Sequence, residues 1–146
     1  MFLKRLPFDV AGTDADIWSV FAIADANGEC QLEQFLDEHM SGPLAENAAQ
    51  LLALLEQLVL DPKGPQRWEG TSRSHESVAG ERIFEFRVGR LRAHWFYGEG
   101  KQIAILAVGA LKSSRTTSKA LARELKRHKL QYESDVAAGQ IYYVPE

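Results

Sequence analysis

Residues 82–97 alternate apolar and polar side chains on both sides of a short glycine-containing break, Gly89-Arg90. Alternation of this kind is typical of β-strands, because successive side chains of a strand point to opposite faces of a sheet. A two-residue connection joins only antiparallel neighbours, and the next connection, residues 98–101, is hardly longer. The sequence therefore predicts a three-stranded antiparallel meander with strands at residues 82–88, 91–97 and 102–110.

The turn at Gly89-Arg90 also sets the register of the first two strands. On the face of the sheet that points away from the core, this register would pair Arg87 with Arg92 and Glu85 with His94. Like charges that face each other across a sheet destabilise it by a few tenths to about 1 kcal/mol. Two alternatives follow: an anion lies over the arginine pair, or both arginines extend into water. The core face would carry three apolar pairs: Val88 with Leu91, Phe86 with Ala93, and Phe84 with Trp95.

The segments on either side of the meander predict one more strand and three helices. Residues 17–24 are rich in β-branched and aromatic side chains and precede a turn, which indicates a strand. The spacing of apolar residues predicts amphipathic helices over residues 31–40 and 44–60. A third amphipathic helix, basic on its outer side, follows residues 113–118, whose serine and threonine hydroxyls can cap it.

The order of these elements predicts the fold class. Residues 61–80 are rich in glycine, proline, serine and charge, so we expect a loop there. The tail, residues 139–146, either adds a short strand or docks as an arm. The resulting order, β-α-α-β-β-β-α, predicts an α+β fold in one domain, residues 1–146, with helices packed on an antiparallel sheet.

Charge is distributed unevenly along the chain, whose net charge is −3. Residues 1–80 hold 5 Lys and Arg against 13 Asp and Glu, a net charge of −8, and residues 131–146 hold none against 3. Residues 81–130 hold 12 against 4, a net charge of +8. A basic middle of this kind suits a polyanion or an acidic protein segment as a partner, and it also suits a solvated charged face.

Several classes of protein are disfavoured by what the chain contains. Cys30 is the only cysteine, so no intramolecular disulfide forms and no cysteine cluster holds zinc. The N-terminus lacks the apolar core of a signal peptide, and every apolar run is too short to span a bilayer. We therefore expect a cytoplasmic protein that does not bind membranes. Neither a metal nor a small-molecule cofactor is expected, because nucleotide-binding motifs and convincing metal-ligand spacing are missing.

The cations of the meander predict an anion site. The third strand leads into Lys112 and Arg115, and a loop that leaves the sheet there would bring both close to the two opposed arginines. Such a cluster binds phosphate through its guanidinium groups and can stabilise the charge of a phosphoryl-transfer transition state without a metal. For His94 two roles are open: a general acid or base, or one half of a surface ion pair with Glu85.

The same residues resemble the core of the RelE/HigB toxin superfamily, in particular its phage-derived HigB-like branch. In that pattern a strand ending in Glu-x-Arg precedes a strand with an arginine before aromatics, a glycine or acidic turn, an apolar strand, a lysine-bearing loop and a final helix. The matching positions are Glu85-Phe86-Arg87, Arg92 to Tyr97, Gly98 to Lys101, Ile103 to Val108, Lys112 and Ala122-Arg123. With the upstream strand and helices, the resemblance covers about residues 17–133 and leaves an N-terminal extension and a C-terminal tail.

The resemblance implies the toxin of a type II toxin-antitoxin system. Such a toxin is a metal-independent endoribonuclease that cleaves mRNA at the ribosome, and a cognate antitoxin, here expected to be a helix-turn-helix protein, neutralises it. By position, Arg87 and Arg92 would hold phosphate, and Lys112 would neutralise the leaving or phosphoryl oxygens. Further contacts to RNA are expected from His94, Arg115, Arg123 and Arg90.

The chain departs from the family pattern ahead of the final helix. That branch usually has two adjacent lysines and a Thr-Pro there, whereas this chain has Leu111-Lys112-Ser113-Ser114 and Thr117-Ser118. The alternative is a diverged, non-catalytic module of the same fold whose basic face binds an antitoxin or another acidic partner. A protein that keeps only the scaffold is a further alternative.

Overall fold

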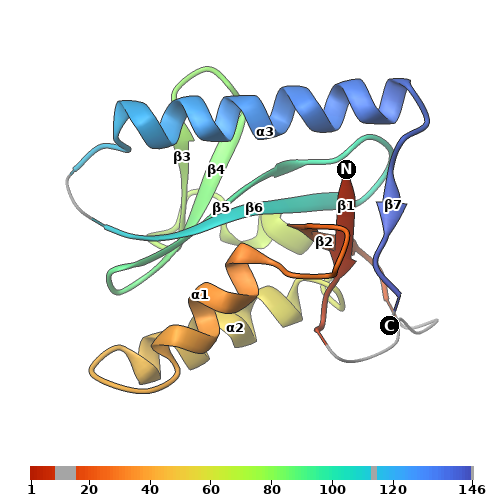
Figure 1. Cartoon of the computed structure of the whole chain (residues 1–146). Helices are drawn as coiled ribbons and strands as arrows, with labels where there is room; N and C mark the ends of the chain where they lie inside the picture. The colour runs from red at the N-terminus through yellow and green to blue at the C-terminus, as the bar shows by residue number, and fades with distance from the viewer. Residues whose placement is uncertain (9–15, 113–114, 146) are drawn as a thin grey trace.

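A seven-stranded sheet with helices on both faces forms the part of the chain that our computed structural model describes, residues 1–8, 16–112 and 115–145 (Figure 1). The strands are β1 (Phe2–Arg5), β2 (Ser19–Ala24), β3 (Ser74–Val78), β4 (Ile83–Val88), β5 (Leu91–Tyr97), β6 (Ile103–Leu111) and β7 (Tyr142–Tyr143). The helices are α1 (Gln31–His39), α2 (Ala45–Gln57), α3 (Lys119–Ala137) and a short 3-10 helix, η1 (Gly64–Trp68). None of these helices is both long enough and apolar enough to cross a membrane.

The sheet has the strand order β3-β4-β5-β6-β2-β1-β7 and is mixed. The meander of β4, β5 and β6 is antiparallel, as predicted. The expectation of an antiparallel sheet holds for only part of it, because β2 pairs with β6 in parallel and β7 pairs with β1 in parallel. The structure is therefore an α+β protein whose sheet is larger than the predicted order of elements provides.

The three additional strands lie at or near the edges of the sheet. β1 falls in the N-terminal extension, β7 in the tail, and β3 in residues 61–80, where we had expected only a loop. β3 has the sequence SHESV and is largely polar. Such a strand contributes few side chains to a core, so its pairing depends on the backbone of β4 and leaves little trace in the sequence.

The register of the β4–β5 hairpin is the predicted one. The structure pairs Val88 with Leu91 and Phe86 with Ala93, and on the other face it pairs Arg87 with Arg92. Glu85 lies opposite His94 and Phe84 lies opposite Trp95, again as predicted. Turn length and the two-residue period of a strand are local properties, which is why the sequence alone specifies this register.

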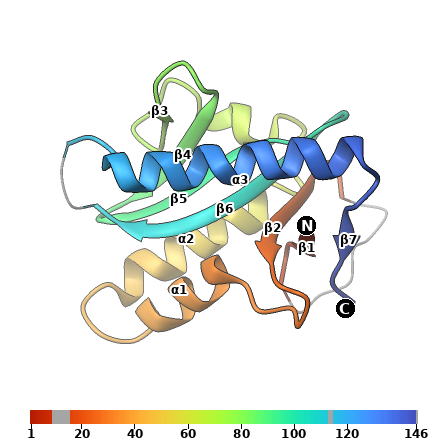
Figure 2. The same ribbon diagram turned by 45° about the horizontal axis from the view of Figure 1, so that its top comes forward.

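Figure 2 shows α1 and α2 on one face of the sheet and α3 on the other, and each face has a core of its own. α1 and α2 pack on one face, where Leu51, Leu55, Phe86 and Trp95 are buried. α3 packs on the other face, and its contacts there are Leu125 and Tyr132 against buried apolar side chains that include Ile83, Phe96 and Ile105. The Tyr132 ring lies 5.6 Å from that of Phe96, and its hydroxyl accepts a hydrogen bond from the Glu99 backbone N–H at 3.0 Å.

A β-bulge in β6 changes the register of its pairing with β5. Trp95 pairs with Leu106, but the preceding residue, His94, pairs with Val108, so that Ala107 is the extra residue. Bulges increase the local twist and change the direction of the side chains that follow. From Val108 onward, the bulge therefore determines which residues of β6 lie on the same face as Arg92 and His94.

α1 is attached to the end of β6 beyond the segment that pairs with β2. The Gln31 side chain accepts a hydrogen bond from the Gly109 N–H at 2.7 Å and donates one to the Gly109 carbonyl at 2.8 Å. It thereby occupies the two backbone groups that a neighbouring strand would otherwise use. Gly109 lies against α1 so closely that a Cβ atom on it would be 2.4 Å from the Phe35 ring.

Replacing Gly109 by alanine is expected to lower the free energy of unfolding by about 1–3 kcal/mol, because the added methyl group overlaps Phe35. Urea unfolding measures this loss. Combined with Phe35→Leu, the same change is expected to cost less than the sum of the two single changes, since the smaller side chain leaves room for the methyl group. Strict additivity would contradict a direct overlap.

Candidate anion-binding site

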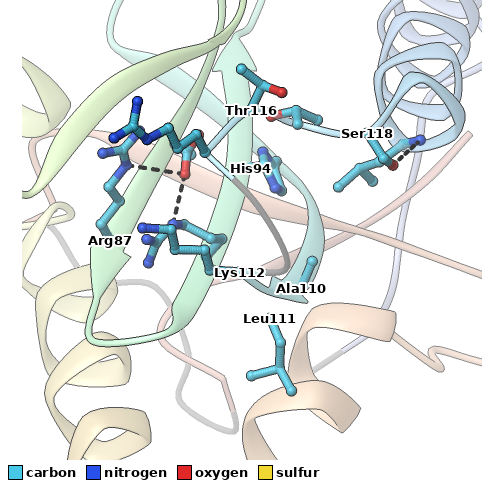
Figure 3. A pocket seen from close by; sticks show the side chains of 12 residues that line it. Arg87, His94, Ala110, Leu111, Lys112, Thr116 and Ser118 are labelled. Atoms are coloured by element: carbon cyan, nitrogen blue, oxygen red, sulfur yellow. Dashed lines mark hydrogen bonds and ion pairs between the residues drawn. The ribbon is translucent and has the colours of Figure 1, made fainter.

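A small cavity of about 60 Å³ opens on the α3 face of the sheet, at the end where the β4–β5 hairpin and the last residues of β6 meet (Figure 3). This volume exceeds the minimum that one water molecule needs, so the cavity has room for one small group. We call it the cationic cavity, after the charged residues and the histidine that line it: Glu85, Arg87, Arg92, His94, Lys112 and Arg115.

The strands and α3 place these side chains together because α3 covers only part of this face. Leu125 and Tyr132 of α3 pack on the apolar part, while Leu121, in the first turn of the helix, lines the cavity. The polar positions of β4 and β5 therefore lie near the first turns of the helix, where Leu121 lines the same cavity. Their alternation with the apolar core residues is the pattern that the sequence predicted for this face.

Glu85 resolves the apparent conflict between the two opposed arginines. Its Oε2 atom lies 2.9 Å from Arg92 Nε and accepts a hydrogen bond from Arg87 Nε at 3.2 Å, as the dashed lines in Figure 3 show. An anion does lie over the arginine pair, as one of our two alternatives proposed, but it belongs to the strand itself. The other alternative, in which both arginines extend into water, is wrong for Arg92, which is 8% exposed.

The Arg92 guanidinium makes several contacts within the protein. Besides its ion pair with Glu85, its Nη1 atom donates hydrogen bonds to the carbonyl oxygens of Gly89 and Leu91 at 2.7 and 2.9 Å. Burial lowers the pKa of Arg92, and Glu85 opposes this shift. Arg92 thus lines the cavity with much of its hydrogen-bonding capacity already used, whereas the Arg87 side chain is 32% exposed. That either arginine holds a phosphate stays a prediction.

His94 is buried under the cations and is not the surface ion pair that we considered. The residue is 2% exposed, and its Nδ1 atom is buried without a hydrogen-bond partner. A buried polar atom without a partner costs about 1–3 kcal/mol. Burial lowers the pKa of His94 below the usual histidine range, and the charge of Arg92 contributes to this, while Glu85 and Glu124 oppose it. The imidazole is therefore neutral at neutral pH.

Lys112 and Arg115 reach the cavity from the segment between β6 and α3, as predicted. The Lys112 backbone N–H donates a hydrogen bond to the Arg90 carbonyl at 2.7 Å, which fixes the start of this segment against the hairpin turn. Both side chains are exposed. With His94 neutral, the cavity has four cationic side chains against the single carboxylate of Glu85. The intervening Ser113 and Ser114 lie outside the described residues.

Two predicted RNA-binding residues do not line the cavity. Arg90 is exposed in the hairpin turn, and Arg123 is exposed on α3. Their predicted contacts to RNA would have to involve the surface around the cavity. Both are close in sequence to residues that line the cavity, since Arg90 precedes β5 and Arg123 lies one turn into α3.

Sequence reasoning did not assign several of the lining residues to the site, among them Thr116, Thr117 and Leu121. Beside them, the Ser118 side chain caps α3 by accepting a hydrogen bond from the Leu121 N–H at 3.1 Å. The capping role was predicted from the run of serine and threonine, but not that the capped end would face the cations. The N-terminal end of a helix carries a partial positive charge, which adds to the preference for an anion.

The chemistry available at the cavity is therefore that of binding an anion. Within the described ranges, no group of three His, Cys, Asp or Glu side chains is placed to hold a metal ion. A scan against models of protein families finds no match, and a search of curated proteins finds no relative. Function has to be inferred from the geometry of the cationic cavity.

Proposed function

We propose that this protein is a metal-independent endoribonuclease toxin of the RelE/HigB type, which cleaves mRNA at the ribosome and is neutralised by a cognate helix-turn-helix antitoxin. The observation that carries the proposal is the cationic cavity: Arg87, Lys112 and Arg115 converge on a space for one small group. A phosphate of the RNA backbone fits that description in charge and size, and the attached nucleotides would remain outside. Apart from β1, η1, β3 and β7, the elements follow one another in the order that the resemblance implies, which also supports the proposal.

The reaction requires only what the RNA and these side chains supply. The 2′-hydroxyl of a ribose attacks the adjacent phosphorus, a new P–O bond forms, and the bond to the 5′-oxygen of the next nucleotide breaks. The proton of the 2′-hydroxyl is released and the 5′-oxygen gains one, so that the products are a 2′,3′-cyclic phosphate and a 5′-hydroxyl. Negative charge develops on the phosphoryl oxygens and on the leaving oxygen, where Arg87 and Lys112 would stabilise it.

A second candidate function is supported by the position of Glu85. The carboxylate of Glu85 already lies between Arg87 and Arg92, so a carboxylate is compatible with these guanidinium groups. A non-catalytic module of the same fold would use the cavity and the exposed cations near it to bind an acidic segment of an antitoxin or another acidic partner. This function predicts a complex without RNA cleavage.

Replacing Arg87 or Lys112 by alanine is expected to reduce mRNA cleavage by about 100- to 1,000-fold, since each change removes a cation that faces the transition state. Cleavage of a defined mRNA in a purified translation reaction measures the effect, and growth arrest on expression without the antitoxin gives a second readout. Circular dichroism establishes that each variant is folded.

Lys101→Ala is the matched control, because Lys101 is exposed in the β5–β6 connection and does not line the cavity. It is expected to cleave like the parent protein. Full cleavage by folded Arg87→Ala and Lys112→Ala variants would refute the assignment of the site. If the parent protein does not cleave RNA but binds an acidic peptide, and both variants lose that binding, the second function is correct.

A further inference from the structure

None of the contacts described above involves the side chain of His94, a buried residue of the cationic cavity. The residue is 2% exposed, lines the cavity, and has an unpartnered Nδ1 atom. Buried polar atoms in proteins nearly always have a partner, so an exception at the wall of a cationic cavity points to a ligand. Lysine and arginine side chains only donate hydrogen bonds, so they can pair with Nδ1 only when it accepts, whereas an anion pairs with Nδ1 when it carries a proton.

The charged groups around His94 come from every element that packs near it. β4 contributes Glu85, which lies directly opposite in register, and Arg87; β5 contributes Arg92; and α3 contributes Glu124, whose charge raises the pKa of His94. Lys112 and Arg115 line the same cavity. On β3, His75 lies opposite Glu85 and is exposed. Burial lowers the pKa of His94, the charge of Arg92 acts in the same direction, and Glu85 and Glu124 oppose them.

We propose that His94 is a ligand of the anion in this cavity and takes up a proton when the anion enters. This inference rests on the proposed function only in that the cavity binds an anion. An anion next to the imidazole offsets the nearby cations and accepts a hydrogen bond from the protonated ring.

Proton uptake makes binding dependent on pH with a definite sign. The complex holds one more proton than the free protein, so affinity rises as the pH falls. The rise reaches at most about tenfold per pH unit, and it occurs between the pKa of His94 in the complex and its lowered pKa in the free protein.

Sulfate is the probe that tests this inference, because it stays a dianion over the range in which histidine titrates. In calorimetric titrations of the full chain we expect sulfate to bind at least about fivefold more tightly at about pH 6 than at about pH 8. Two buffers with different ionisation enthalpies then measure the protons taken up. His94→Gln is expected to bind sulfate with nearly the same affinity at both pH values and without proton uptake.

His75→Gln is the matched control, because His75 lies on the same sheet face opposite Glu85 but is exposed. This variant is expected to keep the full pH dependence. If His94→Gln does not fold, nuclear magnetic resonance of the parent protein provides the test: sulfate must raise the pH at which the His94 imidazole titrates.

Three results overturn the inference: affinity of the parent protein that does not change with pH, pH dependence that survives in His94→Gln, or no binding of sulfate. Other results would refute the endoribonuclease assignment. Proton uptake on binding sulfate, without cleavage of mRNA, refutes the assignment and supports the role of His94. Cleavage of mRNA with sulfate affinity that is independent of pH refutes the role of His94 alone.

Discussion

Glu85→Ala is expected to lower the free energy of unfolding by about 3–5 kcal/mol, because it leaves the buried Arg92 guanidinium without its anion. The Glu85 carboxylate lies 2.9 Å from Arg92 Nε, and the two side chains are only 7% and 9% exposed. Neither charge can regain full hydration when the other is removed. Urea unfolding followed by circular dichroism measures the loss.

Two further variants separate this effect from a general sensitivity to losing an ion pair. Glu33→Ala removes one partner of Lys4, in an ion pair of 2.6 Å whose side chains are 22% and 21% exposed, and it is expected to cost at most about 1 kcal/mol. Replacing Glu85 and Arg92 together by leucine is expected to recover most of the loss, since no unpaired buried charge remains. Equal losses for Glu85→Ala and Glu33→Ala would show that Arg92 does not depend on Glu85.

Trp95→Ala is expected to lower the free energy of unfolding by about 3–5 kcal/mol through the cavity that it leaves in the core. Trp95 follows His94 on β5 and points to the opposite face, where it is 1% exposed. Its ring stacks on Phe86 with centroids 5.2 Å apart and an angle of 9° between the rings. The same urea unfolding experiment measures the loss.

Leu130→Ala is the control for loss of a large apolar side chain, because Leu130 lies on α3 and is 66% exposed. It is expected to change the free energy of unfolding by no more than about 0.5 kcal/mol. Trp95→Phe keeps an aromatic ring beside Phe86 and is expected to lie between the two. A loss for Trp95→Ala as small as that for Leu130→Ala would contradict its place in the core.

Much of the fold near the site was predictable because it depends on short-range features of the sequence. The hairpin at Gly89-Arg90 has the expected register, and α1, α2 and α3 have the expected apolar stripes. The parallel pairings of β2 with β6 and of β1 with β7 were not predictable. They join segments far apart in the chain, and the sequence pattern of a short or edge strand does not indicate which strand it pairs with.

The cationic side chains and the histidine of the candidate site were predictable, but the contacts between them were not. The sequence placed Arg87, Arg92 and His94 on one face and suggested that Lys112 and Arg115 would lie nearby. It did not reveal that Glu85 would pair with both arginines. Arg92 and His94 are buried because β4, the end of β6, residues 115–118 and the first turn of α3 meet around them, and that closure depends on how distant elements pack.

The amino-acid sequence by itself determined the composition of the charged face, since alternation along β4 and β5 assigns each side chain to one side of the sheet. Only the tertiary structure decided which of these charged side chains are paired and which are buried. Pairing, burial and the bulge at Ala107 depend on contacts between β4, β5, β6 and α3. The energy of a charge depends on its surroundings in three dimensions, so Arg87 stays partly exposed while Arg92 and His94, from the neighbouring strand, are enclosed.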